Sequence, residues 1–229
     1  MAKIAIVYSS GHGHTKTVAR HVFEGASAYP ETEVQLLEIS FAQIDEAGRW
    51  SDAGIMAKLA AGDAIVFGAP TYMGSAHGLF KLFLEAAFTP WLNQAWKDKI
   101  GAGFTNSASR SGDKLVTLQQ MAVFATQMAM VWVGVGDQPG GNFTDSQVTD
   151  VNINGSWLGL MTQSVADGSA QDAPHQGDRL TAERFGRRIA RTAARWVLGT
   201  EAFPVQPVSE QETHRRNLVG HSEWLRFDD

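Results

Sequence analysis

The chain of 229 residues contains no cysteine. Disulfide bonds, thiolate catalysis and iron–sulfur or zinc sites with cysteine ligands are therefore excluded. Charged side chains are also scarce, at 19% of the residues, whereas hydrophobic residues make up 44%. A low charged fraction favours extensive burial or contacts between subunits, so we expect the chain to form a homo-oligomer, a dimer or a tetramer.

Long apolar runs are missing as well. The sequence has no stretch of about 18 apolar residues, and its first residues lack the charged and apolar regions of a signal peptide. We expect a cytoplasmic protein with no membrane partner. The formal net charge is −5 and no basic stripe is visible, so we also expect no nucleic-acid partner.

Short apolar runs alternate with amphipathic segments along the chain. Strands are expected near Lys3–Tyr8, Glu33–Glu38, Ala64–Phe67, Ile100–Phe104 and Met130–Val133. Helices are expected near Thr15–Ala28, Asp52–Ala60, Gly78–Phe88, Lys114–Met128 and Thr181–Leu198. This alternation predicts an α/β fold with a parallel sheet covered on both faces. Ligands of such sheets bind beyond the carboxyl ends of the strands.

The first strand breaks into a loop of small and hydroxyl-bearing residues that leads directly into a helix. The loop has neither the Gly-Lys-Ser/Thr of a nucleoside-triphosphate P-loop nor the third glycine of the dinucleotide fingerprint, since Lys16 stands there. Unpaired N–H groups at a helix N-terminus, with hydroxyl donors beside them, fit a phosphate monoester held without a metal ion. The candidate phosphate ligands are Ser9, Ser10, His12, Gly13, His14 and Thr15.

Two other interpretations of this loop stay open. It can be a plain strand-to-helix turn in which Thr15 or a neighbour is the N-cap. It can also bind a metal ion through His12 and His14, but no cysteine or clustered carboxylate accompanies that spacing. We therefore expect no metal.

Two further polar loops follow the third and fourth expected strands. In one, Pro70 is expected to end the strand and Gly74 to permit a tight turn, and an ordinary turn is the alternative. The other is rich in hydroxyl and amide groups, which suits the polar edge of a flat heterocycle. Three polar loops at one sheet edge predict a crevice for a flat ring with one phosphate, and FMN matches that description. The candidate ring-binding residues are Pro70, Thr71, Tyr72, Met73, Gly74, Thr105, Asn106, Ser107 and Ser109.

Two tryptophans lie between the third expected helix and the fourth expected strand. Trp91 either walls a substrate pocket or packs in a core or an interface, and Trp96 is expected in the core. The long polar segment 134–178 is expected to be an insertion that packs through Trp157, Leu158 and Leu160, with disorder as the alternative.

The expected organisation is one domain over residues 1–199 that includes this insertion, followed by a C-terminal extension over residues 200–229. In the extension, Trp224 and Phe227 look like anchors onto the body or onto a neighbouring subunit.

The sequence resembles the WrbA-type NAD(P)H:quinone oxidoreductases over about residues 2–198. The segments that carry the resemblance are the phosphate loop at 8–15, the Gly-Ala-Pro-Thr-Tyr-Met-Gly run at 68–74, the tryptophan-containing segment at 91–99, the Phe-Thr-Asn-Ser-Ala run at 104–108 and the Asn-Gly-Ser-Trp-Leu-Gly run at 154–159. Three features depart from the family pattern. Tyr72 replaces an arginine, the phosphate loop is one residue shorter, and about Gln127 stands where the family has a histidine near the flavin.

The resemblance implies a flavodoxin-like three-layer fold with a five-stranded parallel sheet in the order 2-1-3-4-5. It also implies bound FMN, a two-electron hydride relay from NAD(P)H to a quinone, and a homotetramer whose active sites lie near subunit contacts. The chemistry then belongs to the flavin, and no side chain is assigned as catalytic, with Trp91 and Tyr72 expected as pocket walls. The departures leave the choice between NADH and NADPH, and the choice of quinone, open.

Three other functions compete with this interpretation. One is a one-electron flavodoxin carrier, although carriers tend to be strongly acidic and −5 over 229 residues is modest. Another is an NAD(P)H-dependent reductase of free flavin or of azo or nitro compounds. The last is a flavin-free structural or signalling module, against which the hydroxyl-rich loop argues.

Overall fold

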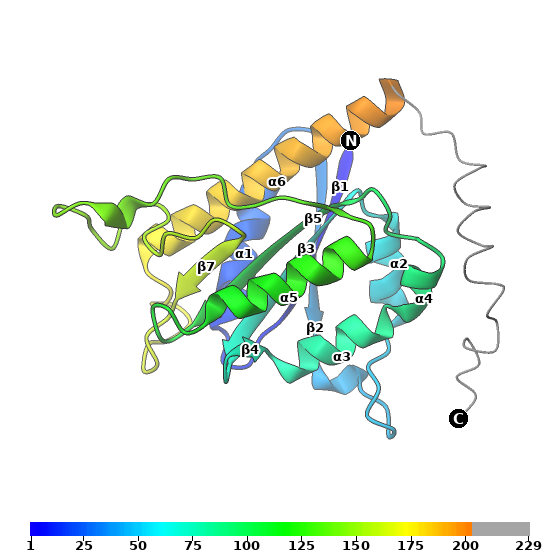
Figure 1. Cartoon of the computed structure of the whole chain (residues 1–229), viewed down its shortest axis with the longest axis horizontal. Helices are drawn as coiled ribbons and strands as arrows, with labels where there is room; N and C mark the ends of the chain where they lie inside the picture. The colour runs from blue at the N-terminus through cyan, green and yellow to red at the C-terminus, as the bar shows by residue number, and fades with distance from the viewer. Residues whose placement is uncertain (203–229) are drawn as a thin grey trace. The chain divides into compact units, whose positions relative to one another are not determined.

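The computed structural model describes residues 1–202 (Figure 1). The chain divides into two units, Met1–Trp196 and Val197–Asp229. Of the second unit the structure describes residues 197–202, so the expected anchors Trp224 and Phe227 lie outside the described residues. The expected domain boundary after residue 199 stays a prediction.

A parallel sheet forms the centre of the first unit. Its five core strands lie in the order β2-β1-β3-β5-β6. They are β1 (Ala2–Ser9), β2 (Thr32–Ile39), β3 (Ala64–Tyr72), β5 (Ile100–Ser107) and β6 (Val131–Trp132). The order expected for the five core strands is confirmed. The described sheet has seven strands rather than five, because β4 (Ser75–Ala76) pairs with β3 and β7 (Leu160–Gln163) pairs with β5.

Helices cover both faces of this sheet. They are α1 (His14–Ser27), α2 (Ala53–Ala61), α3 (Gly78–Ala86), α4 (Phe88–Leu92), α5 (Lys114–Gln127) and α6 (Gln176–Ala202). Ala5 and Val7 of β1 join a core cluster with α2, α3 and α5. The residues between them in β1 point to the opposite face, because successive side chains of a strand alternate. Figure 1 shows α3 and α5 in front of the strands and α1 behind them.

Helices α1 and α6 approach each other closely behind the sheet. A Cβ on Gly25 would overlap the backbone of Glu183, and a Cβ on Gly186 would overlap the backbone of Val22. These two glycines therefore allow contact between the helix backbones that any larger residue would prevent.

The outer position next to β5 is shared by two strands. β6 pairs with Ile100 and Gly101 at the start of β5, and β7 pairs with residues 104–107 at its end. The expected insertion thus leaves the sheet and returns to it. Its expected packing is confirmed for Leu160 and Leu158, but it is wrong for Trp157, which is 57% exposed.

Strand β3 continues through Pro70 to Tyr72, so the expectation that Pro70 ends it is wrong. The carbonyl of Pro70 accepts from the His77 N–H at 3.1 Å, and the strand is prolonged by pairing with β4. Met73 and Gly74 have φ values of 49° and 79°. Two consecutive positive φ angles are typical of a tight hairpin turn, so the turn itself is confirmed.

Two other boundaries differ from expectation because tertiary partners extend the elements. Strand β5 includes Thr105, Asn106 and Ser107, since β7 pairs with them, so the third polar loop begins later than expected. Helix α6 begins at Gln176, before its apolar periodicity starts, and its first turn buries Asp178.

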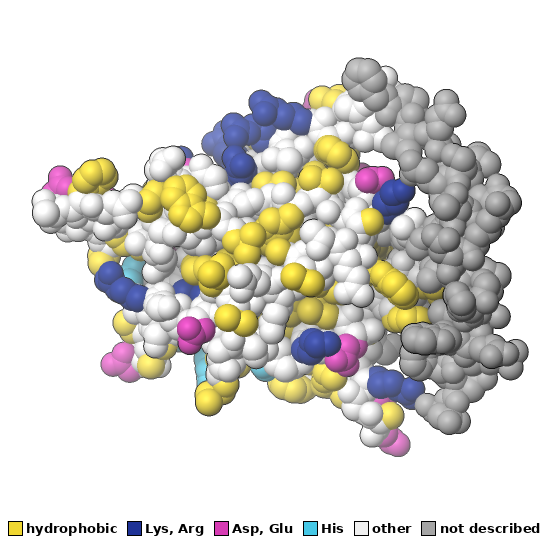
Figure 2. All heavy atoms as spheres, in the orientation of Figure 1, with side chains coloured by type: hydrophobic (Ala, Val, Ile, Leu, Met, Phe, Trp, Pro, Cys, Tyr) yellow, Lys and Arg dark blue, Asp and Glu magenta, His cyan; other side chains and the backbone are white. Residues whose placement is uncertain are grey.

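Arginines gather on one face of α6, where Figure 2 shows a dark-blue group. Arg184, Arg187, Arg188 and Arg191 line a hollow of about 620 Å³ with Asp137. The expectation that no basic stripe exists is wrong, because spacings of three and four residues bring these side chains to one helix face. The absence of a nucleic-acid partner stays a prediction.

Within residues 1–202, no helix is both long enough and apolar enough to cross a bilayer.

Candidate functional site

A cavity of about 670 Å³, here called the strand-end cavity, lies where β1, β3 and β5 end. Its lining comes from the start of α1, the β3–β4 hairpin, the end of β5 with the following loop, and the segment after β7. The lining residues are His12, His14, Thr15, Pro70, Thr71, Tyr72, Met73, Asn106, Ser107, Ala108, Ser109, Gly112, Ser164 and Ala166. All three predicted loops therefore meet in one cavity.

Some candidates from the sequence do not line this cavity, namely Ser9, Ser10, Gly13, Gly74 and Thr105. Ala108 lines the cavity within the predicted 105–109 segment, whereas sequence reasoning missed Gly112, Ser164 and Ala166. Ser164 and Ala166 belong to the expected insertion, and only the pairing of β7 with β5 brings them to this edge. No local signal in the sequence indicates that pairing.

The first turn of α1 forms one end of the cavity. Its N-cap is Gly13, with φ 88° and no capping side chain, so the alternative in which Thr15 is the N-cap is wrong. The Ser10 hydroxyl oxygen accepts from the N–H groups of Gly13 at 3.2 Å and Lys16 at 3.3 Å. Within residues 1–202 the N–H groups of His14 and Thr15 have no acceptor. This end therefore has donors available for an anion.

The end of the insertion is hydrogen-bonded to this turn. His14 Nε2 lies 2.8 Å from the Gly168 carbonyl, and the Thr17 hydroxyl donates to the Ala170 carbonyl at 2.9 Å. Because a carbonyl can only accept, His14 Nε2 carries the proton and is not free to bind a metal ion. Among residues 1–202, the side chains close enough together to form a metal site are His21, Glu24 and Glu183. Neither His12 nor His14 belongs to this cluster.

Asn106 supplies an oriented amide to the cavity wall. Its Oδ1 accepts from the Thr162 hydroxyl at 2.8 Å and from the Ser164 hydroxyl at 3.0 Å. Asn106 is 4% exposed, and its Nδ2 has no partner among the described residues. Since both acceptor positions of the amide oxygen are used, the NH₂ group is left to donate into the cavity.

Aromatic rings form one side of the cavity. The Tyr72 ring meets the rings of His12 and His77 edge to face, with centroids 6.3 Å and 5.3 Å apart. Burial raises the pKa of the Tyr72 phenol and lowers the pKa of His77. Tyr72 also lies against Gly11, where any Cβ would overlap its hydroxyl. The Tyr72 phenol therefore remains protonated over the phosphate loop.

Several candidate hydroxyls are used inside the wall. Thr71 Oγ1 lies 2.8 Å from Thr105 Oγ1 and 2.7 Å from Thr117 Oγ1, all three residues being buried. The fully buried Ser9 hydroxyl lies 3.3 Å from His77 Nδ1. Thr105 thus supports the lining residue Thr71 from behind, and Ser9 supports His77, whose ring packs against Tyr72.

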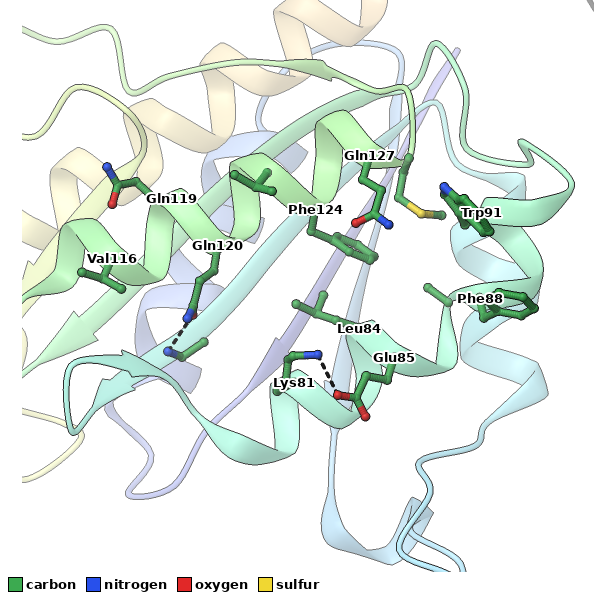
Figure 3. A pocket seen from close by; sticks show the side chains of 14 residues that line it. Lys81, Leu84, Glu85, Phe88, Trp91, Val116, Gln119, Gln120, Phe124 and Gln127 are labelled. Carbon is green, nitrogen blue, oxygen red and sulfur yellow. Dashed lines mark hydrogen bonds and ion pairs between the residues drawn. The ribbon is translucent and has the colours of Figure 1, made fainter. Parts of the chain in front are cut away.

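Trp91 does not line the strand-end cavity of its own chain. It lies in a separate groove of about 730 Å³ that α3, α4 and α5 form with Leu84, Phe88 and Phe124 (Figure 3). We call this the aromatic groove. Figure 2 shows yellow side chains spread over the face where α5 runs. Trp96 is fully buried, so its expected place in the core is confirmed.

The family is decided by a model for NADPH-dependent FMN reductases, which matches residues 2–142. The chain belongs to this family. Flavodoxin FldP of Pseudomonas aeruginosa (strain UCBPP-PA14) is 40% identical to this FMN reductase-family protein over 191 residues, 83% of the chain and 96% of the relative. An NAD(P)H dehydrogenase (quinone) of Azorhizobium caulinodans is 31% identical over 205 residues, 85% and 98% of the two chains.

A solved structure agrees with this membership. The flavodoxin, WrbA-like protein from Agrobacterium tumefaciens superposes on this FMN reductase-family protein with a TM-score of 0.63 at 35% identity, over 85% of this chain and 99% of that one. The resemblance to WrbA-type proteins and the flavodoxin-like α/β fold are therefore confirmed. The protein is an oxidoreductase of a flavodoxin-like, FMN-dependent family.

Proposed function

We propose that the protein binds FMN in the strand-end cavity and passes two electrons from NAD(P)H to a quinone-like acceptor. The observation that carries this proposal is a single cavity of about 670 Å³ with a helix N-terminus at one end and the Asn106 amide in its wall. Ligand sites of this kind occupy roughly 300–1,000 Å³. Bound FMN would supply the hydride chemistry, and the protein would supply orientation and electrostatics.

The chain's own residues fit a phosphate monoester at the α1 end. The N–H groups of His14 and Thr15 are free, and Thr15 is a lining residue whose hydroxyl has no partner within residues 1–202. The lining contains no Lys or Arg, so these neutral donors and the helix dipole would balance the phosphate charge.

The chain's own residues also fit the polar edge of a flat ring. The Asn106 NH₂ group would donate to a ring carbonyl, and Pro70, Tyr72 and Met73 would border the ring on its other side. Donors placed there stabilise negative charge that develops when the ring is reduced. Met73 is fully exposed at the hairpin tip, so it borders the opening through which substrates enter.

Trp91 can wall such a site only from a neighbouring subunit, because it lies in the aromatic groove of its own chain. We propose a homo-oligomer, a dimer or tetramer, in which the groove face contributes to subunit contacts. A cytoplasmic location belongs to the same proposal.

The test begins with the visible spectrum of the purified protein and release of the cofactor by denaturation. Released FMN, followed by steady oxidation of NADH or NADPH with benzoquinone, supports the proposal. A colourless protein that fails to bind FMN below millimolar concentration contradicts it. Parallel assays with azo and nitro compounds and with free flavin identify the acceptor class.

A one-electron flavodoxin carrier is the second candidate, because the 40% identical relative is named a flavodoxin. A carrier would contain FMN but would show almost no steady-state NAD(P)H oxidation with benzoquinone. The two candidates therefore agree on the cofactor and differ on turnover.

A further inference from the structure

A lysine side chain is buried directly behind the ring-edge wall of the strand-end cavity. Lys114 begins α5 and is 0% exposed. Its ammonium donates to the Ser107 hydroxyl at 3.0 Å and to the carbonyls of Ser109 and Arg110, each at 2.7 Å. All three hydrogen-bonding positions of the ammonium are thus filled by the last residue of β5 and the loop that follows it.

The backbone curves around this ammonium. Gly112 and Asp113 have positive φ values of 53° and 55°, and the Lys114 N–H donates to the Ser111 carbonyl at 3.1 Å. A side chain on Gly112 would overlap the Ser107 hydroxyl. The turn from Ser109 to Asp113 is therefore shaped to enclose a cation while Ser107, Ser109 and Gly112 line the cavity on its other side.

The charge of Lys114 is balanced from the insertion side. Asp178 is 1% exposed and accepts from Asn154 Nδ2 at 2.8 Å and from the Gln163 N–H at 2.7 Å. It attracts Lys114 electrostatically, and His175 lies near enough to act on it as well. Burial lowers the pKa of Lys114 to about 8 and raises the pKa of Asp178 to about 6, so both groups are charged at pH 7.

This placement opposes two local preferences. A cation at a helix N-terminus is repelled by the helix dipole, and a buried ammonium loses its hydration. Residues that oppose such local preferences, but whose hydrogen bonds are all satisfied, concentrate at functional sites. An apolar side chain of the same length could fill this space, but it could not form the three hydrogen bonds that join the end of β5 to the following loop.

We propose that Lys114 is a positioning residue for the ring end of the flavin site, which holds the 107–110 segment in the shape that receives the ring. This inference rests on the proposed FMN site. It assigns to Lys114 the ring end of the cavity and gives it no part in the phosphate end at α1.

The experiment separates the two ends of the site with three probes. Riboflavin reports the ring end, inorganic phosphate reports the α1 end, and FMN reports both. Apoprotein is titrated with riboflavin and FMN by flavin fluorescence, and phosphate binding is followed by the thermal shift that it produces. The variants are Lys114→Met, which keeps the stem and removes the ammonium, and Lys58→Met, the same change on the exposed side of α2.

In Lys114→Met we expect the affinities for riboflavin and FMN to fall together, each by about 10-fold or more, as loss of hydrogen bonds from a charged donor implies. The phosphate-induced shift should be unchanged, and the midpoint potential of bound FMN should become more negative because a nearby positive charge is removed. Lys58→Met should match the wild type in every measurement.

Undiminished riboflavin affinity in Lys114→Met overturns the inference. The inference is also overturned if Lys114→Met loses both flavin binding and the phosphate-induced thermal shift, because the lysine would then stabilise the whole fold rather than the ring end alone. If Lys114→Met does not fold, Lys114→Gln, which retains an N–H donor, should give the same pattern with a smaller loss. Failure of both variants to fold counts against the inference. A wild-type protein that binds neither flavin overturns the proposed function itself, a result distinct from the others.

Discussion

At the scale of single residues, the phosphate end of the strand-end cavity depends on Thr15. Replacing it by leucine removes a hydroxyl and fills space beside the free N–H groups of the first turn. We expect Thr15→Leu to weaken FMN binding by about 1.5–3 kcal/mol, the contribution of a hydrogen bond to a charged group. Fluorescence titration of the apoprotein measures this, and Thr144→Leu at an exposed position is the matched control. Unaltered affinity would remove Thr15 from the phosphate site.

Asn106 allows a second test at this scale. Asn106→Asp keeps the oxygen that accepts from Thr162 and Ser164 but replaces the NH₂ donor by a negatively charged acceptor. We expect riboflavin affinity to fall by about 10-fold or more and the midpoint potential of bound FMN to fall with it. Asn93→Asp, at an exposed position, should leave both values unchanged. Equal riboflavin affinity in Asn106→Asp and wild type would show that the amide does not meet the ring.

Asp178 makes stability depend on pH. Burial raises its folded-state pKa from 3.8 to about 6, so the folded protein holds a proton that the unfolded chain releases between these values. The wild type should therefore lose stability, relative to Asp178→Asn, as the pH rises from about 4 to about 6. A shift of about two pKa units corresponds to about 3 kcal/mol.

Urea unfolding of wild type and Asp178→Asn at pH 4, 5, 6 and 7 measures this difference, with Asp145→Asn at an exposed position as control. Above about pH 7 the stability difference should level off, because Asp178 is then ionised in both the folded and the unfolded chain, until deprotonation of Lys114, whose pKa is about 8, becomes appreciable. A wild type that gains stability relative to Asp178→Asn between pH 4 and pH 6 would reverse the sign and contradict the assignment.

At the scale of elements, the contact between α1 and α6 depends on glycines. A Cβ on Gly186 would overlap the carbonyl of Val22, so Gly186→Ala must push the two helices apart. We expect a loss of about 1–3 kcal/mol in the free energy of unfolding, the usual cost of overpacking. Gly199→Ala, where nothing lies within 4 Å, should instead be neutral or stabilising by up to about 1 kcal/mol. Denaturant midpoints distinguish the two, and equal midpoints would show that α6 can shift without cost.

Elements with strong local signals could be predicted from the sequence. β1, α1 and α5 lie within one residue of their expected bounds, and β3 begins at the expected Ala64. Elements that depend on distant partners could not. β7 is a strand because β5 pairs with it, and β3 continues past Pro70 because β4 prolongs it.

For the whole molecule, we expect the aromatic groove and the exposed apolar residues of α5 to form contacts between subunits. We expect sedimentation velocity to give a mass that is a multiple of the 24.8 kDa chain. Val123 is 65% exposed on α5, so Val123→Glu should shift the distribution towards the monomer while the far-UV circular dichroism stays unchanged. Leu198→Glu, also 65% exposed, is the control on α6. A wild type that sediments as a monomer at micromolar concentration would contradict the proposed oligomer.

The α/β class and the three loops that meet at one sheet edge follow from the sequence alone, through local periodicity, glycine and proline in turns, and the rule that parallel strands end together. The order of the five core strands is what the resemblance to WrbA-type proteins implies, and the structure confirms it. Only the tertiary structure decided which side chains reach the cavity and which support it. Ser164 contacts Asn106 across 58 residues, and Asp178 attracts Lys114 from a distant part of the chain, with burial shifting the pKa of both charged groups. A single sequence carries no signal for such contacts, because they exist only once distant segments pack against each other.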